Sequence, residues 1–241
     1  MNLIEQASPE SRFLISSDAA KKIKPANLPI RFLMEFIADG RTPARAMTDE
    51  TMRNFLPALE GANRIIELGA AGNYYKNFAA NRENYVTSNL GEGCDIKLDM
   101  TNLDLPDDSV DALVSVFALE HVYDFPSVFQ EQYRVLKPGG RILLAVPFLY
   151  YYHAAPDDFF RFTESALDKL LDPLTILSKQ AIGNRWLLFS ELLHEKVVMG
   201  SKRKPLGRLI LRMIALPFLA RALNRHDPQY ALGFVYLCEK S

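Results

Sequence analysis

From residue 64 onwards, continuous apolar runs alternate with amphipathic segments. The runs at residues 64–68, 110–118 and 141–148 are those expected of strands buried on both faces of a sheet. Residues 125–136 instead carry apolar side chains at helical spacing. The side chains predicted to face the core from this helix are Phe125, Val128, Phe129, Tyr133 and Leu136. Strands that alternate with helices indicate βαβ units and a parallel sheet with right-handed crossovers.

Weaker patterns complete the α/β region. Residues 84–89 and 94–98 predict a second and a third strand, and residues 230–240 predict a last one. Residues 73–82 predict a helix after the first strand. Thr163 predicts the N-cap of a helix that Pro173 ends. The segment Lys137-Pro-Gly-Gly predicts a turn.

Residues 1–60 predict a helical extension that precedes the α/β domain. Residues 28–40 predict a short helix that ends at Gly40, and Thr48 predicts the N-cap of a second helix. The α/β domain is expected to occupy residues 61–241, with a helical insertion at about residues 184–226.

Three chemically distinctive loops follow the first three predicted strands. They are the glycine-containing loop Glu67–Asn73, then Asn89, then Asp99 with Met100. Ligands of open parallel sheets bind outside the carboxyl ends of the strands. Glycines there let the backbone approach a ligand closely, and a carboxylate accepts hydrogen bonds from an amino group. An Asp in this place is also a common turn residue, and that alternative is open for Asp99.

The segments IIELGAAG, LDM, DDSVDALVSVFALEHVYD and YRVLKPGGRILLAVPF occur in this order over residues 64–148. Together they resemble the class I S-adenosylmethionine-dependent methyltransferases, of which LEH and LKPGG are characteristic. The resemblance implies a Rossmann-like α/β fold with a mostly parallel seven-stranded sheet, an antiparallel last strand and helices on both faces. It also implies S-adenosyl-L-methionine as the cofactor. A nicotinamide dehydrogenase is disfavoured because LEH and LKPGG do not belong to that fold.

By this resemblance, Gly69 and Gly72 line the methionine part of the cofactor and Asn89 meets the ribose. Asp99 and Met100 meet the adenine, while Phe117 and Ala118 pass the sulfur. The residues expected to bind the cofactor are Glu67, Gly69, Ala71, Gly72, Asn89, Asp99, Met100, Phe117 and Ala118.

The first loop departs from the family, which has three glycines at alternate positions. Only Gly69 keeps its place, Ala71 and Asn73 occupy the other two, and Gly72 is out of phase. Asn73 tolerates a positive φ and is expected to replace a glycine conformationally. Asn89 lacks the usual charge. These departures keep open a second hypothesis, a non-catalytic methyltransferase-like binding or scaffold protein.

Residues 146–163, VPFLYYYHAAPDDFFRFT, resemble a bacterial subgroup with an HxxPxDFxR(Y/F)T segment. The subgroup implies polysaccharide or glycolipid biosynthesis, and therefore O-methylation of a sugar, glycolipid or related small molecule. His153 is the expected base, with Asp157 and His121 as the other catalytic candidates. Structural roles for both histidines are open alternatives. Asp158 and Arg161 predict a local ion pair.

The composition of the whole chain argues against several classes of protein and binding site. The 28 basic and 29 acidic residues give a net charge of −1, which provides no case for nucleic-acid binding. No HExxH motif or Cys/His spacing is found, so no metal site is expected. No signal peptide or spanning segment is recognised, so a cytoplasmic protein is expected.

Residues 204–225 form a basic and apolar segment that Pro217 is expected to break into two short helices. No acidic residue occurs between Lys196 and His226. A basic amphipathic helix is typical of peripheral membrane contact, and packing of the segment over the sheet is the alternative.

Overall fold

The structure is a computed structural model that describes residues 23, 32, 42–154, 156–193, 205–222 and 227–241. The helix predicted for residues 28–40 lies outside these residues, apart from Phe32.

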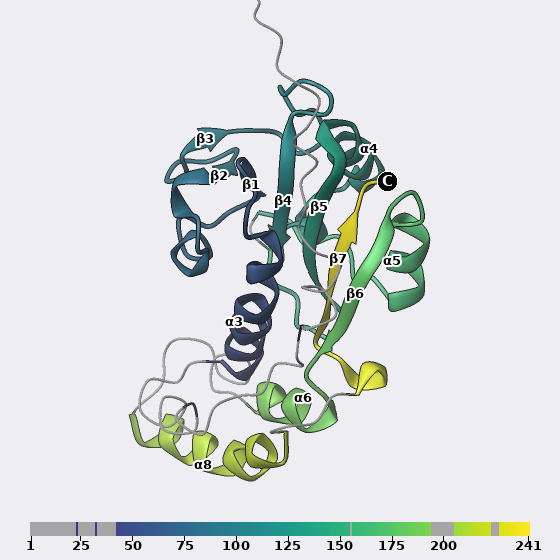
Figure 1. The fold of residues 1–241 in the computed structure, drawn as a ribbon. Coiled ribbons are helices and arrows are strands. Elements are labelled where there is room, and N and C mark those ends of the chain that lie inside the picture. The colour runs from purple at the N-terminus through teal and green to yellow at the C-terminus, as the bar shows by residue number, and fades with distance from the viewer. Residues whose placement is uncertain (1–22, 24–31, 33–41, 155, 194–204, 223–226) are drawn as a thin grey trace, which may run out of the picture.

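A seven-stranded sheet forms the centre of the molecule, with the order β3-β2-β1-β4-β5-β7-β6 (Figure 1). The strands are β1 (Ile65–Leu68), β2 (Tyr85–Asn89), β3 (Ile96–Lys97), β4 (Val110–Val116), β5 (Leu136–Pro147), β6 (Thr175–Ile182) and β7 (Gly233–Glu239). Only β7 runs antiparallel to its neighbours. The predicted Rossmann-like methyltransferase fold is therefore confirmed. The chain order reverses between β1 and β4, which is the switch point where this class of sheet binds ligands.

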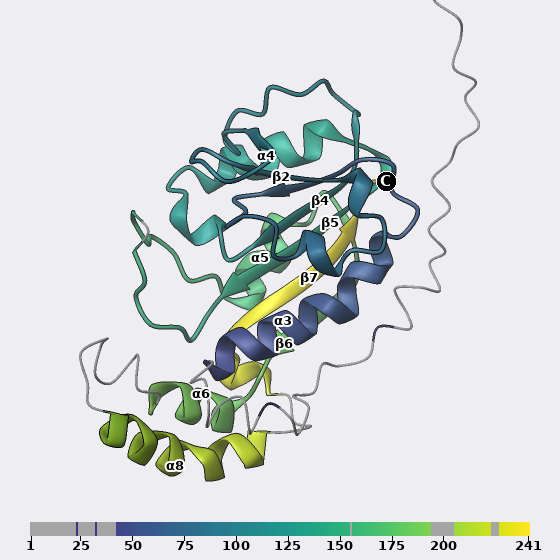
Figure 2. The same ribbon diagram turned by 90° about the vertical axis from the view of Figure 1, so that its left-hand side faces the viewer.

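Helices cover both faces of the sheet (Figure 1 and Figure 2). Helices α3 (Pro43–Phe55), α4 (Phe125–Val135) and α5 (Glu164–Leu170) lie against these faces, and α6 (Arg185–Leu192) and α8 (Pro205–Ala222) lie beyond one end of the sheet. Successive strand residues point to opposite faces. Thus Ile65 packs in one core cluster with Met52 and Phe55 of α3, while Ile66 packs in a second cluster with Val128 of α4. Helix α3 is therefore part of the core of the sheet.

The helix predicted to begin at Thr48 begins earlier. The Thr42 side chain caps α3 by accepting a hydrogen bond from the Arg45 N–H at 3.4 Å, and Pro43 provides the preset φ of a first helical position. Thr48 lies inside the helix, where its hydroxyl donates to the Ala44 carbonyl at 2.9 Å. The predicted cap was wrong because the Thr-Pro pair at residues 42 and 43 is the stronger start signal.

The helix predicted for residues 73–82 was also wrong. Two short 3-10 turns, η2 (Lys76–Phe78) and η3 (Arg82–Asn84), take its place. Tyr74 and Tyr75 both donate hydrogen bonds to Asp49 of α3, at 2.7 and 3.1 Å. These tertiary bonds offer the segment an alternative to helix formation that no local pattern reveals.

Three smaller differences from the sequence-based predictions concern β5, α4 and β6. Leu136 to Gly140 belong to β5, with a register shift opposite Val110 and Ala112 where a turn was expected. Tyr133 of α4 is exposed, and Gln132 lies in the core instead. Strand β6 was not recognised because its side chains are mostly half-buried and lack a clear alternation.

Helices α6 and α8 follow β6 and precede β7 along the chain. In space they lie beyond the end of the sheet at which β6 ends (Figure 2). Helix α8 continues through Pro217 as one element, so the predicted break was wrong. Ala215, Leu219 and Ala222 bury one side of α8, which holds the helix despite the backbone hydrogen bond that Pro217 loses. Within the described ranges, no helix has the length and apolar character needed to cross a bilayer.

Candidate functional site

A cavity of about 910 Å³ opens at the carboxyl ends of β1, β2 and β4. Seven of the nine expected cofactor residues line it, namely Gly69, Ala71, Asn89, Asp99, Met100, Phe117 and Ala118. The structure does not bring Glu67 or Gly72 into its lining. His121 lines it as well, so a candidate on the acceptor side borders the same space.

In the glycine loop, Gly69 leaves no room for a side chain. Gly69 has a φ of +72°, and a Cβ built on it would lie 2.5 Å from the Ala118 Cβ. Gly72 also has a positive φ, of +89°, whereas Asn73 does not. The expectation that Asn73 replaces a glycine conformationally was therefore wrong. Its side-chain oxygen instead accepts a hydrogen bond from the Thr87 hydroxyl at 3.1 Å.

Asn89 braces the same loop. Its amide nitrogen donates to the Ala70 carbonyl at 2.8 Å, and its side-chain oxygen accepts from the Leu90 N–H at 2.7 Å. An aspartate could not donate the first of these bonds. Asn89 therefore lacks the charge that an aspartate would have and holds the Ala70 carbonyl of the loop instead.

Asp99 and Met100 follow the short strand β3. One Asp99 oxygen, Oδ1, accepts hydrogen bonds from the Thr101 N–H at 2.8 Å and from its hydroxyl at 2.7 Å. The turn role that was left open for Asp99 is thus present. Because both bonds use Oδ1, the second oxygen remains available to a ligand, beside the buried Met100.

Glu67 lies below the cavity, buried in β1. The Tyr85 hydroxyl donates to its carboxylate at 2.8 Å. Burial raises the pKa of Glu67 to about 7, which the Tyr85 hydrogen bond and the Arg45 charge only partly oppose. Glu67 therefore belongs to the core next to the loop and does not line the cavity.

Phe117 directly follows β4 and has a φ of +50°, which is unusual for a side chain of this size. The chain then enters the 3-10 turn η4 (Leu119–His121), which corresponds to the LEH segment. The strained residue redirects the backbone so that Ala118 and His121 border the cavity.

The loop after β5 docks on this turn. The Phe159 N–H donates to the Glu120 carbonyl at 2.8 Å, and the His121 Nδ1 bonds to the Asp157 carbonyl. The Asp157 side chain is exposed, so this candidate reaches the site through its backbone. His121 and His153 come together, with 5.1 Å between their ring centroids.

Glu120 lies beneath both imidazoles and is completely buried, with 0% of its side chain exposed. Its Oε1 is 3.5 Å from His153 Nε2 and 3.8 Å from His121 Nε2. Sequence reasoning missed this residue. It stands inside the LEH segment, but only tertiary contact shows that its carboxylate turns inward.

His153 is held from its other side. Its Nδ1 lies 3.2 Å from both the Asp158 carboxylate and the Tyr151 carbonyl. The Glu120 carboxylate raises the pKa of His153, and burial opposes it. Arg161 binds Asp158 through two bonds of 2.5 and 2.6 Å, which confirms the predicted ion pair. This pair keeps the pKa of Asp158 well below its usual range.

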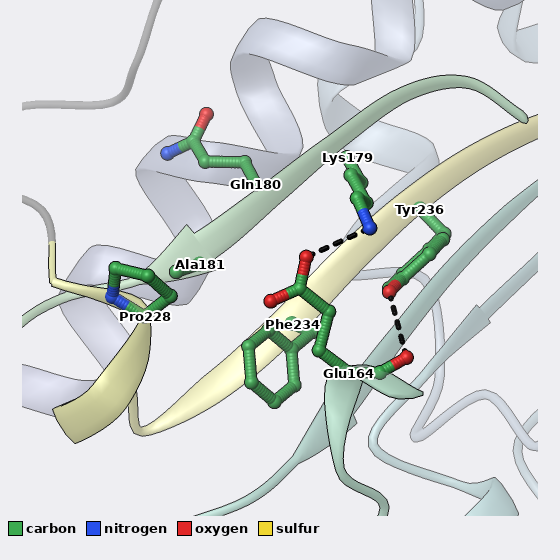
Figure 3. A pocket seen from close by; sticks show the side chains of 7 residues that line it. All are labelled: Glu164, Lys179, Gln180, Ala181, Pro228, Phe234 and Tyr236. Atoms are coloured by element: carbon green, nitrogen blue, oxygen red, sulfur yellow. Dashed lines mark hydrogen bonds and ion pairs between the residues drawn. The ribbon is translucent and has the colours of Figure 1, made fainter. Parts of the chain in front are cut away.

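A second cavity, of about 330 Å³, lies against β6 and β7 (Figure 3). Lys179 forms ion pairs with Glu164 and Asp168 there, both at 2.8 Å. The Tyr236 hydroxyl donates to the Glu164 carbonyl at 3.3 Å and to Asp168 at 2.8 Å. These four side chains pair with one another, and this cavity holds none of the residues predicted to bind the cofactor or the acceptor, so the first cavity is the better candidate site.

Two comparisons with known sequences match part of this chain. Residues 71–144 match the methyltransferase domain family. A probable S-adenosylmethionine-dependent methyltransferase of Mycolicibacterium smegmatis is 42% identical over 48 residues, which are 20% of this chain. The match spans about a fifth of that relative, 19% of its length.

Solved structures share the fold. A S-adenosylmethionine-dependent methyltransferase from Archaeoglobus fulgidus has a TM-score of 0.54 at 15% identity, over 88% of this chain and 100% of its own. The 1,6-didemethyltoxoflavin-N1-methyltransferase of Burkholderia thailandensis, with bound S-adenosylhomocysteine, has a TM-score of 0.53 at 14% identity, over 98% and 92%. A 4+2 cyclase has a TM-score of 0.52 at 15% identity, over 80% and 81%. Residues 71–144 thus match the methyltransferase domain family, and the chain shares its fold with S-adenosylmethionine-dependent methyltransferases.

Proposed function

We propose that this protein transfers a methyl group from S-adenosylmethionine to a hydroxyl of a sugar, glycolipid or related small molecule. The observation that carries the proposal is the single cavity shared by the cofactor candidates and His121. The HxxPxDFxR(Y/F)T resemblance supports the acceptor class and, with it, a role in polysaccharide biosynthesis.

The residues present fit the cofactor. The cavity offers backbone at Gly69 and Ala71, a carboxylate at Asp99 and the apolar Met100. Asp99 Oδ2 would accept from the adenine amino group, and Met100 would pack on the ring. Asn89 would meet the ribose with its remaining lone pair. When bound, the cofactor supplies an electrophilic methyl group on a sulfonium for in-line displacement.

On the acceptor side, the chain's task is to hold the hydroxyl oxygen in line with the methyl group. We place that oxygen beside His121 and His153, which two loops bring together. Asp157 contributes its carbonyl, which fixes the orientation of the His121 ring. The aromatic rings of Tyr150 and Tyr151 stack at 4.5 Å and pack against His153, forming a wall suited to a sugar face.

Isothermal titration with S-adenosylmethionine and S-adenosylhomocysteine tests the cofactor half of the proposal. Saturable binding of one equivalent is expected. The absence of binding by both compounds would overturn the proposal.

The second candidate function is a non-catalytic methyltransferase-like binding or scaffold protein. Ala71, Asn73 and Asn89 favour it, because they depart from the family at the cofactor loop. The fold alone does not decide, since a cyclase shares it. Methyl transfer to any glycan acceptor, lost in Asp99→Ala, would exclude this candidate.

We also propose peripheral contact of residues 204–225 with an anionic membrane surface of the cytoplasm. Four apolar side chains of α8 are exposed, namely Leu209, Ile210, Met213 and Ile214. The lack of acidic residues between Lys196 and His226 complements anionic lipid. Such contact would suit a lipid-linked acceptor.

A further inference from the structure

Glu120 is a buried carboxylate whose surroundings the proposed cofactor site does not explain. Its side chain is fully buried, and neither carboxylate oxygen has a hydrogen-bond partner among the described residues. Burial of an unpaired carboxylate is costly, so buried charges in proteins are paired or coordinate metals. The groups that face this carboxylate are His121 Nε2 and His153 Nε2.

We propose that Glu120, His121 and His153 form a binding site for one divalent transition-metal ion. Their candidate ligand atoms all lie within 4.8 Å of one another. A tetrahedral ion about 2.1 Å from each ligand needs ligand separations of about 3.4 Å. The carboxylate lies 3.5 and 3.8 Å from the two nitrogens, so small side-chain movements suffice.

The surroundings of both imidazoles match those of metal-binding histidines. A ligating histidine usually donates its second ring N–H to a carbonyl or carboxylate, which fixes the tautomer and the ring. The Asp157 carbonyl takes this role for His121 Nδ1. Asp158 and the Tyr151 carbonyl take it for His153 Nδ1. When Nδ1 donates, each Nε2 is unprotonated, and it lies 3.8 Å (His121) or 3.5 Å (His153) from the Glu120 carboxylate.

The charge balance indicates what else the ion would bind. Arg161 neutralises Asp158 and the Asp157 carboxylate is exposed to solvent, so Glu120 supplies the negative charge next to the two imidazoles. One carboxylate and two neutral imidazoles leave a divalent ion with a net charge of about +1. This excess favours an anionic oxygen as a further ligand.

His121 also lines the cofactor cavity, so the open coordination positions would face the acceptor. This step rests on the proposed methyl transfer. A metal-bound hydroxyl has a lowered pKa and a fixed position. The metal site would therefore restrict the acceptor to molecules whose reactive hydroxyl, or an oxygen next to it, can bind a metal ion.

The test uses the full chain after treatment with a chelator and dialysis. Co²⁺ is titrated while the visible absorption is recorded, and Zn²⁺ is titrated by calorimetry. One equivalent of each ion is expected to bind, with a Co²⁺ spectrum typical of four or five ligands. Zn²⁺ is also expected to raise the melting temperature.

Glu120→Gln keeps the shape of the side chain and removes the anionic ligand. His153→Ala changes a half-buried loop residue and guards against a folding defect in the first variant. Each is expected to weaken Zn²⁺ binding more than about tenfold. Asp157→Asn is the matched control, because it removes an exposed carboxylate from the same loop and keeps the carbonyl that binds His121. Its affinity for Zn²⁺ is expected to stay within about twofold of wild type.

The proposal is overturned if the wild-type protein binds neither ion, or if both ligand variants bind as tightly as wild type. Titration with S-adenosylhomocysteine in the presence of chelator separates this failure from failure of the proposed function. Cofactor binding without metal binding would overturn only the metal site.

Discussion

At the scale of single residues, two buried glutamates illustrate how surroundings decide the role of a carboxyl group. Glu67 accepts a hydrogen bond from the Tyr85 hydroxyl inside the core, and its pKa rises to about 7. Glu120 faces two imidazoles at the edge of the cavity. The first is therefore expected to affect stability, and the second to affect ligand binding.

The raised pKa of Glu67 predicts a pH-dependent stability. Its usual value of 4.5 rises to about 7 in the folded chain, so its contribution is complete below 4.5 and is lost as pH rises through 7. Between about pH 5 and pH 8, the free energy of unfolding should fall by about 2–3 kcal/mol more in wild type than in Glu67→Gln. Urea unfolding across this range measures the difference. Parallel pH profiles would contradict the prediction.

Asp99 is predicted to contribute a ligand contact beyond its turn. Asp99→Ala removes both, whereas Thr101→Val removes one of the turn's hydrogen bonds, that from the Thr101 hydroxyl, and keeps the carboxylate. We expect Asp99→Ala to weaken S-adenosylhomocysteine binding by about tenfold or more, and Thr101→Val by less than about threefold. Calorimetric titration gives both affinities. Equal losses would assign Asp99 to the turn alone.

At the scale of elements, the loop after β1 combines backbone conformation with close packing. Gly69 and Gly61 both have positive φ, of +72° and +89°. A Cβ at position 69 would meet Ala118, while one at position 61 would have no atom within 4 Å. Alanine substitutions at the two glycines therefore separate the free-energy cost of the backbone conformation from that of the steric contact.

Gly61→Ala is expected to lower the free energy of unfolding by about 1 kcal/mol, from backbone strain alone. Gly69→Ala carries the same strain plus a steric clash, for a total of about 2–4 kcal/mol. Chemical denaturation of the two variants beside wild type gives the comparison. If both lose the same amount, the loop moves freely away from Ala118 and the close approach is not required.

At the scale of the whole molecule, helices α6 and α8 lie beyond the carboxyl end of β6 (Figure 2). Helix α8 buries Ala215, Leu219 and Ala222 and exposes the apolar side chains named above. A membrane-facing helix would therefore lie on the same end as the cavity. This arrangement would bring a lipid-linked acceptor close to His121.

Charge reversal on α8 tests this contact. Arg208→Glu with Arg212→Glu should reduce co-sedimentation with anionic liposomes by about tenfold or more, because each basic residue near the surface contributes about 1 kcal/mol. Arg82→Glu with Lys97→Glu changes the net charge equally on exposed residues near β2 and β3, and should have little effect. A wild-type protein that does not sediment with liposomes would end the proposal.

The sequence by itself determined the main strands of the sheet and the loops at their carboxyl ends. Continuous apolar runs are a local property, and so are the loops that follow them, so β1, β4 and β5 were predictable near residues 64, 110 and 141. The order of the strands then follows from the family resemblance. Cofactor candidates on successive strands meet because parallel strands share one carboxyl edge.

Tertiary structure alone decided the other features. Residues 73–82 lack a long helix because Tyr74 and Tyr75 bond to Asp49, about 25 positions earlier. The cluster of Glu120, His121 and His153 escapes any spacing motif, since its members come from two loops 32 residues apart. Long-range pairing of polar groups leaves no periodic signal in a sequence, because its energy depends on which side chains the fold removes from water together.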